Sequence, residues 1–169
     1  MFVAFWMLQR LTREINDIQK QIMDKQIELS HYTKYAGQLG GTTNLSINNI
    51  AGLSSDLVPR ASVFAQYSDQ ASSMSAMQNL QMMKMMGRVP VTGNPMIDMQ
   101  IQMSAYNQFK QEALKALKQQ EVNAMNEKEK AVQLELNALQ AQLQVKKSQI
   151  ESYKQLVSDS AKAAAPNFG

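Results

Sequence analysis

Few side chains in this sequence suit catalysis or metal binding, and the first is the single histidine, His31. It lies near Glu28 on the same face of a predicted helix. One histidine in a chain without cysteine cannot build the usual transition-metal site, and no strand-turn-helix elbow accompanies it to favour a Ser-His-Asp arrangement. We therefore interpret His31 as a surface or interface residue, and we expect no metal and no cofactor.

Carboxylates are the other candidates for acid–base chemistry. No histidine accompanies them on their predicted helix to recruit a metal, and residues 126–130 (NEKEK) alternate both charge signs, which is typical of a solvated helix face. We expect a solvated face rather than a catalytic pair, and the sequence predicts that the protein is not an enzyme. These carboxylates are Glu112, Glu121, Glu127, Glu129, Glu135 and Glu151.

Motifs for phosphate and nucleic-acid binding are also missing. The glycines of residues 87–95 (GRVPVTGNP) are not followed by Lys-Ser or Lys-Thr, so this segment is a turn and not a phosphate loop. Lys146, Lys147 and Lys154 form a small basic patch without interleaved aromatic residues, and we expect no nucleic-acid partner. The absence of cysteine excludes disulfides, thiolate metal sites and thiol nucleophiles.

Composition indicates what kind of fold carries these residues. The 169 residues suit one domain, and 44% are hydrophobic, with 13 methionines but only seven glycines and four prolines. Sparse turn residues, together with few valines and isoleucines, exclude a sandwich or barrel of short strands. A net charge of +3 and a charged fraction of 18% fit neither a disordered acidic chain nor a polycation. The composition is that of a helical protein.

Apolar residues near the N-terminus recur at alternating steps of three and four, which predicts a coiled-coil helix over residues 3–36. Gly37, Gly40 and Gly41 are expected to end it, so that residues 1–36 form the first region. The apolar positions are Met1, Ala4, Leu8, Leu11, Ile15, Ile18, Ile22, Leu29 and Tyr32, with Lys25 as the single polar interruption.

The middle region, residues 37–98, begins with a segment rich in Gly, Asn, Ser and Thr that carries spaced aliphatic residues. We interpret residues 37–58 as an ordered connector. A second helix is predicted from Pro59 to Met86, with Gly87 as its stop. Small residues about one turn apart would let another backbone approach closely, and they are Ala61, Ala65, Ser68, Ser72 and Ala76.

After the turn at residues 87–95, Asn94 and Pro95 are a good N-cap and first-turn pair. The absence of Gly and Pro from residue 96 to 165 predicts a helix to about residue 163, and residues 99–165 form the last region. Its second half carries another seam of apolar residues at steps of three and four: Met125, Val132, Leu136, Leu139, Leu143, Ile150, Tyr153 and Val157.

Methionines on both sides of the 87–95 turn are the most unusual feature. Methionine side chains are flexible and adapt to irregular surfaces. Two interpretations stay open: the core of one end of a helical hairpin, or an interface that receives another subunit or a partner. The cluster comprises Met74, Met77, Met82, Met83, Met85, Met86, Met96, Met99 and Met103.

Together these elements predict an all-α fold in which residues 1–36 and about 120–163 pair as an antiparallel coiled-coil hairpin, beside a shorter middle helix and ordered loops. We expect the hairpin to bring Gln21 near Gln149. One chain of long helices has too little width to bury two seams, a small-residue helix and a methionine cluster, so partners are expected. The first is the chain itself, as a homo-oligomer or filament, with other subunits of the same assembly as further candidates.

The leading functional hypothesis is therefore a self-assembling structural protein that builds a helical filament or tube. Its layout resembles that of flagellin-like axial subunits, which also lack cysteine and pair their terminal helices, although the Phe residues around Trp6 and the high Met count depart from that pattern. The predicted assembly interface comprises Phe2, Phe5, Trp6, Leu8, Leu11, Ile15, Ile18, Ile22, Leu136, Leu139, Leu143, Ile150, Tyr153, Met82, Met83, Met85 and Met86.

Two other functions stay open. One is a coiled-coil adaptor or export chaperone that uses the Met-rich helix as a groove, and the other, less favoured, is a membrane-active protein that inserts residues 2–8. The sequence shows no cleavable signal peptide and no transmembrane run, which favours the cytoplasm or export to the cell surface by a signal-independent route.

Overall fold

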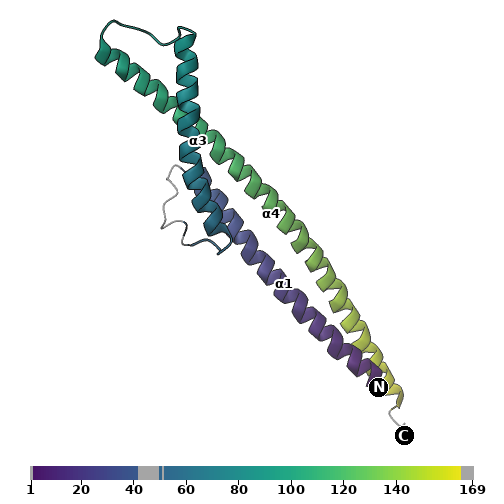
Figure 1. The fold of residues 1–169 in the computed structure, drawn as a ribbon. Helices are drawn as coiled ribbons and strands as arrows, with labels where there is room; N and C mark the ends of the chain where they lie inside the picture. The colour runs from purple at the N-terminus through teal and green to yellow at the C-terminus, as the bar shows by residue number, and fades with distance from the viewer. Residues whose placement is uncertain (1, 42–49, 51, 165–169) are drawn as a thin grey trace. The chain divides into compact units, whose positions relative to one another are not determined.

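The computed structural model describes residues 2–41, 50 and 52–164, and their fold is all-α. Three helices are described: α1 (Phe2–Gly40), α3 (Leu57–Met85) and α4 (Pro95–Ala164) (Figure 1). The long helices α1 and α4 pack together, and α3 also packs on α4. The predicted fold class is therefore confirmed. The chain forms two compact units, a first unit of Met1–Ser30 with Glu129–Gly169 and a second unit of His31–Lys128.

In the first unit, α1 and the last part of α4 run antiparallel, and two ion pairs fix their register (Figure 1). Lys25 Nζ lies 2.7 Å from Glu135 Oε2, and Lys146 Nζ lies 2.6 Å from Glu14 Oε2. The residue numbers of each pair add up to 160, as they must in an antiparallel pair with one constant register. Both predicted seams face the space between the helices, where the buried residues are Leu11, Ile18, Val132 and Leu136.

The expected proximity of Gln21 and Gln149 is wrong by about ten residues of register. Gln149 lies instead beside Leu11, with which it lines a small hollow. Two apolar stripes with steps of three and four residues can pair at offsets that differ by whole or half heptads, so the spacing alone leaves the offset open. In the folded chain the observed offset is the one that brings the charges of Lys25 and Glu135, and of Glu14 and Lys146, together.

The second unit holds the best-buried core of the described chain. The end of α1, the start of α3 and the middle of α4 meet there, and Ile50 and Leu53 pack with them. Tyr35 and Met125 are completely buried, and Leu39 is almost so. The core cluster consists of Tyr35, Leu39, Ile50, Leu53, Leu57, Ala61 and Met125.

Contrary to the sequence prediction, α1 continues through Gly37 and ends at Gly40. Glycine in a helix interior costs about 1 kcal/mol relative to alanine, which is too little to end a helix whose next turn is buried. Tyr35 and Leu39 extend the apolar face past Gly37 into the core, and their burial outweighs that cost. Part of the predicted connector, residues 42–49 and 51, lies outside the described residues.

Helix α3 begins at Leu57, two residues before the predicted start, and ends at Met85. Its small-residue stripe lies on the buried face, as its spacing suggested. Ser68 and Ser72 are buried there, and their hydroxyls donate to the carbonyls of Ala65 and Asp69 at 3.3 and 3.0 Å. Because these hydroxyls are satisfied within α3, the stripe packs without an unpaired polar group.

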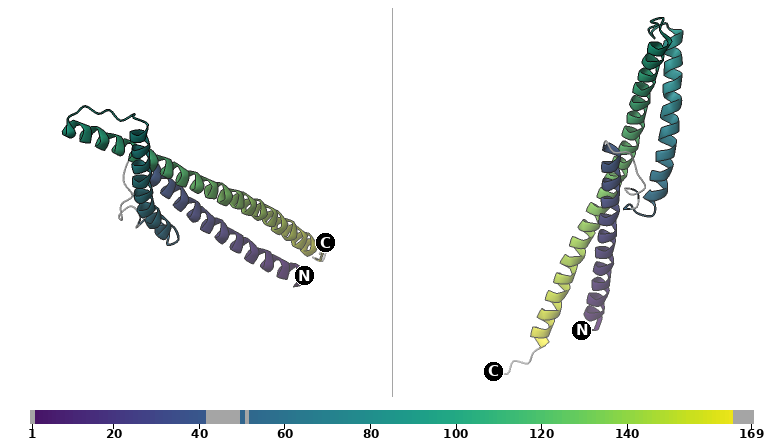
Figure 2. Two further views of the ribbon diagram at one scale, coloured as in Figure 1. Left: turned by 45° about the horizontal axis from the view of Figure 1, so that its top comes forward. Right: turned by 90° about the vertical axis from the view of Figure 1, so that its left-hand side faces the viewer.

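The stop and start on either side of the 86–94 turn match the sequence prediction. Gly87 has φ +66°, its N–H donates to the Lys84 carbonyl, and the Arg88 N–H donates to the Met83 carbonyl, which is a Schellman end. The Asn94 side chain accepts a hydrogen bond from the Met96 N–H at 3.1 Å and so caps α4, which begins at Pro95. Helix α4 then runs without interruption to Ala164 (Figure 2).

Candidate interaction surfaces

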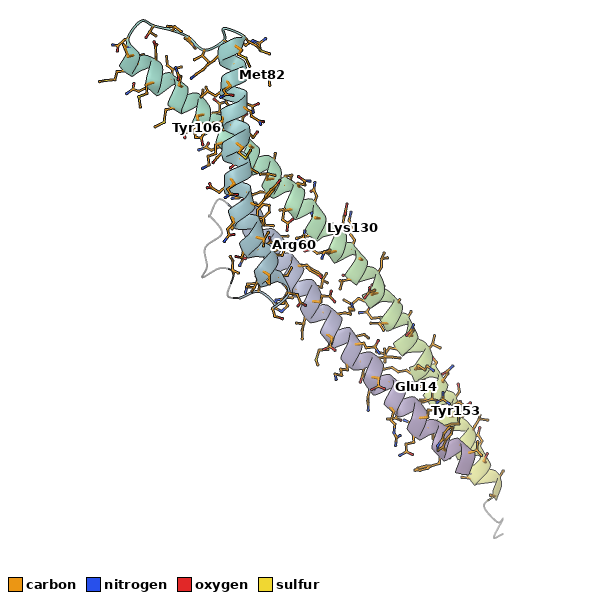
Figure 3. The ribbon with its side chains drawn as sticks, in the orientation of Figure 1. Glu14, Arg60, Met82, Tyr106, Lys130 and Tyr153 are labelled. Carbon is orange, nitrogen blue, oxygen red and sulfur yellow. The ribbon has the colours of Figure 1, made fainter. Side chains whose placement is uncertain are left out.

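Many of the exposed large apolar side chains of the described chain lie on the second unit, on the 86–94 turn and the helix segments that flank it. Met85 is 82% exposed and Val91 is 84% exposed. Met82, on the last turns of α3, is labelled in Figure 3. We call this area the methionine surface, and it consists of Met74, Met77, Met82, Met85, Met86, Val91, Met96, Ile97, Met99 and Met103.

The side chains nearest the turn, such as Met85 and Val91, are exposed because α3 and the first turns of α4 diverge toward the turn that joins them (Figure 1). Nearer the core, small residues such as Ser72 and Ala76 keep α3 close to α4 and are fully buried. Beyond Ala76, no residue of α3 is buried. The hairpin-core interpretation of the methionines is therefore wrong for all but Met83, which is half-buried.

The turn that carries the methionine surface is ordered by its own hydrogen bonds. The Thr92 N–H and hydroxyl both donate to Asp98 Oδ1 at 2.7 Å. Both bonds lower the pKa of Asp98 below its usual value of 3.8, and the bond from the Thr92 N–H has the larger effect. The carboxylate is thus charged at neutral pH, and it holds Thr92 beside the first turn of α4. The methionine surface is presented on a fixed turn.

A second exposed apolar group lies at the start of α1, in the first unit. Phe5 is 70% exposed and Trp6 is 57% exposed, with Val3 beside them. The Arg10 guanidinium lies 5.9 Å from the centre of the Trp6 ring and covers one face of it in a cation–π contact. The predicted interface residues Phe5 and Trp6 thus remain accessible in the single chain, and the side chain of Phe2 lies outside the described residues.

The remaining predicted interface residues divide between two locations. Leu11, Ile18 and Leu136 are buried within the chain's own helix pair. Met82, Met85 and Met86 lie on the methionine surface. The other seam residues are half-buried in the first unit: Leu8, Ile15, Ile22, Leu139, Leu143, Ile150 and Tyr153.

A polar cluster joins α1, α3 and α4 at the edge of the second unit's core. Arg60 donates from Nε to Glu121 Oε1 at 2.5 Å and from its terminal nitrogen to Oε2 at 2.9 Å, a bidentate pair. The Tyr35 hydroxyl donates to the same Oε1 at 3.3 Å. Burial, reinforced by the Glu121 charge, raises the pKa of Tyr35, and the hydrogen bonds to Glu121 raise the pKa of Arg60.

This cluster ties the three helices together. Its carboxylate accepts hydrogen bonds from a guanidinium and a phenol whose raised pKa values keep both of those groups protonated at neutral pH. The charge pattern does not distinguish Glu121 from the other carboxylates of α4. Its position in the sequence does indicate that it faces the other helices: Glu121 lies four residues before the seam residue Met125 and so continues the buried stripe.

No metal-binding grouping is found among the described residues. Glu28 and His31 do have Glu-x-x-His spacing on α1, but no set of three His, Cys, Asp or Glu side chains that could hold an ion occurs in this part of the chain. Nor does any described helix contain a stretch long and apolar enough to cross a membrane. The hollows of the structure are open surface grooves, such as those lined by Met7 and Tyr153 in the first unit.

Comparison with known proteins adds no family assignment, because no family model, no curated protein and no solved structure matches this chain.

Proposed function

We propose that this protein is a structural subunit that assembles with copies of itself, and that the methionine surface is the contact on which assembly depends. The observation that carries the proposal is the exposure of ten large apolar side chains on one ordered turn and the helix ends beside it. A concentration of exposed apolar side chains near one turn is typical of an interaction site in a folded protein. Burying a methionine side chain completely is worth about 1.5–3 kcal/mol, so several of them together can hold subunits together.

The charge of the chain favours identical partners. A net charge of +3 spread over 169 residues puts few like charges opposite one another when copies pack side by side. Charges are also sparse on the methionine surface itself, where Lys84 and Arg88 stand beside the turn and Asp98 is held by Thr92. Such a surface can contact the same surface, or a different surface, of a second copy of the chain with little electrostatic repulsion. A contact that does not close into a ring extends into a filament.

The test is to make the methionine surface polar without touching the core. We expect the unmodified protein to form large particles or filaments in sedimentation and negative-stain microscopy. The triple variant Met82→Gln, Met85→Gln, Met86→Gln should lose them while its circular dichroism stays helical, because these side chains are exposed and support no core.

A matched control is Met23→Gln with Ile27→Gln, which replaces two exposed apolar side chains of α1 in the first unit. We expect this variant to assemble as the unmodified protein does. Equal sedimentation of the triple variant and the unmodified protein would contradict the proposal. Discrete small particles that grow only when another protein is added would favour the adaptor or chaperone function, for which flexible methionines are also suited.

A further inference from the structure

Helix α4 carries a second stripe, of apolar and small residues, in the first unit, on the side that α1 does not cover. Most of its positions follow a seam residue by two, for example Leu134 after Val132 and Val145 after Leu143. Two residues correspond to about 200° around a helix, so the stripes lie on opposite faces of α4. The second stripe keeps steps of three and four and comprises Leu134, Ala138, Ala141, Val145, Ser148 and Ser152, followed by Leu156.

Every member of this stripe is exposed. Leu134, Val145 and Leu156 are 70%, 56% and 59% exposed, and the members between them are small. Ala141, Ser148 and Ser152 help to line a groove along the helix. The Ser152 hydroxyl already donates to the Ser148 carbonyl at 3.0 Å, so it needs no further partner when the groove is covered.

The order of side chains along the stripe is self-complementary about Val145. If a second copy of the stripe is laid antiparallel so that Val145 meets Val145, then Leu134 meets Leu156 and Ala138 meets Ser152. The residue numbers of each of these pairs add up to 290. Leucines then meet at both ends, valines meet at the centre and small residues meet between them, which suits two helix axes about 8–10 Å apart.

The flanking side chains permit the same arrangement. In this register the nearest flanking pairs are Gln144 with Gln144, Gln142 with Gln149, and Asn137 with Glu151, so no like charges face one another. The carboxylate of Glu135, which also borders the stripe, is held on the other side by Lys25.

We infer that α4 pairs with α4 of a second copy of this chain, antiparallel, with Val145 on the two-fold axis. The inference rests on the proposed self-assembly and names one of its contacts. The contact is isologous and closes on itself, so it makes a dimer. A dimer that carries two copies of the methionine surface can then extend through a second contact.

Cysteine substitutions test this register directly, because the sequence contains no other cysteine. In the full-length protein under mild oxidation, Val145→Cys should form a disulfide-linked dimer at least about tenfold faster than Gln140→Cys, because pairing raises the local thiol concentration. Gln140 is equally exposed on α4 but would lie about 15 Å along the axis from its own copy. Equal rates for the two variants would overturn the inference.

A mixture separates antiparallel from parallel pairing. Ala138→Cys and Ser152→Cys should each crosslink poorly alone, because identical positions are about 21 Å apart in this register, and should crosslink readily when mixed. If each variant crosslinks with itself but not with the other variant, the helices are parallel and the inference is overturned.

Charge at the axis gives a readout without oxidation. Val145→Lys and Val145→Glu should each abolish the dimer in analytical ultracentrifugation, and their mixture should restore it as a heterodimer. A mixture that stays monomeric while the unmodified protein forms dimers would overturn the inference.

Combining Val145→Cys with the triple methionine variant separates the two proposals. If the crosslink forms and large particles are lost, both proposals are supported. If large particles form without the crosslink, this contact alone is rejected. If the crosslink forms and large particles remain despite the methionine changes, the proposed role of the methionine surface alone is rejected.

Discussion

Lys146 of α4 and Glu14 of α1 form an ion pair across the two helices of the first unit, with Nζ and Oε2 2.6 Å apart. Arg10 donates to the other carboxylate oxygen at 2.9 Å from within α1. These two hydrogen bonds, that of Lys146 being the stronger, lower the pKa of Glu14 below its usual 4.5. Glu14 therefore links the two helices as a charged group, and its contribution to stability must depend on pH.

Replacing Glu14 with Gln tests this dependence. A carboxyl group whose pKa is lowered by folding stabilises the folded state above its unfolded pKa, and that contribution is lost as the pH falls through the folded pKa. At pH 7 Glu14→Gln should therefore melt below the unmodified protein, by a small margin because the pair is exposed. The difference should shrink once the pH falls below 4.5. Thermal melts followed by circular dichroism from pH 7 to pH 2.5 would measure it.

The control is Asp17→Asn, which removes an exposed carboxylate of the same helix. It should not reproduce the pH-dependent difference. A Glu14→Gln difference that persists unchanged at the lowest pH would show that its cause is not the charge.

The glycines of α1 and of the 86–94 turn should respond to alanine in opposite directions. Gly37 is helical, and a Cβ there would meet nothing within 4 Å, so Gly37→Ala should stabilise the protein by about 0.5–1 kcal/mol. Gly87 also has space for a Cβ but has φ +66°, so Gly87→Ala should destabilise by about 1 kcal/mol. Urea unfolding at one fixed protein concentration compares them. Stabilisation by both would contradict the left-handed stop at Gly87.

The Arg60–Glu121–Tyr35 cluster should matter more for stability than the exposed ion pairs. Glu121→Ala leaves the guanidinium and the buried phenol without their acceptor and should cost about 1–3 kcal/mol in urea unfolding. Tyr35→Phe keeps the buried ring and removes one hydrogen bond of 3.3 Å, and it should cost less. The reverse order would mean that the cluster does not support the second unit.

The sequence predicted much of this fold because its strongest patterns are local. The 3,4 spacing of Leu11 and Ile18 identified the buried face of α1, and Gly87 and Asn94 identified where one helix ends and the next begins. These features depend on neighbours within a few residues, which the sequence displays.

The misses depend on distant partners. The position at which α1 ends follows from the burial of Leu39 in a core made by three segments. This burial outweighs the small free-energy cost of placing Gly37 inside a helix. The role of Glu121 requires Arg60, 61 positions away, and the exposure of Met85 requires α3 and α4 to diverge. Spacing along one helix contains none of this information.

The aromatic group at the start of α1 gives a direct optical test of self-assembly. Phe5 and Trp6 are exposed in the single chain, and covering each is worth about 1.5–3 kcal/mol. We predict that a second subunit covers them on assembly, so that the fluorescence of Trp6, the only tryptophan, shifts to the blue as protein concentration rises in the absence of lipid.

A charged substitution identifies the cause of that shift. Phe5→Glu should weaken assembly and suppress the blue shift while leaving the helices intact, because Phe5 supports no packing in the single chain. Gln9→Glu places the same charge one turn along α1, at an exposed position that is already polar, and should change neither measurement. A shift that occurs only when anionic vesicles are added would instead assign the aromatic group to a membrane surface, because interfacial insertion moves Trp6 out of water without a second subunit.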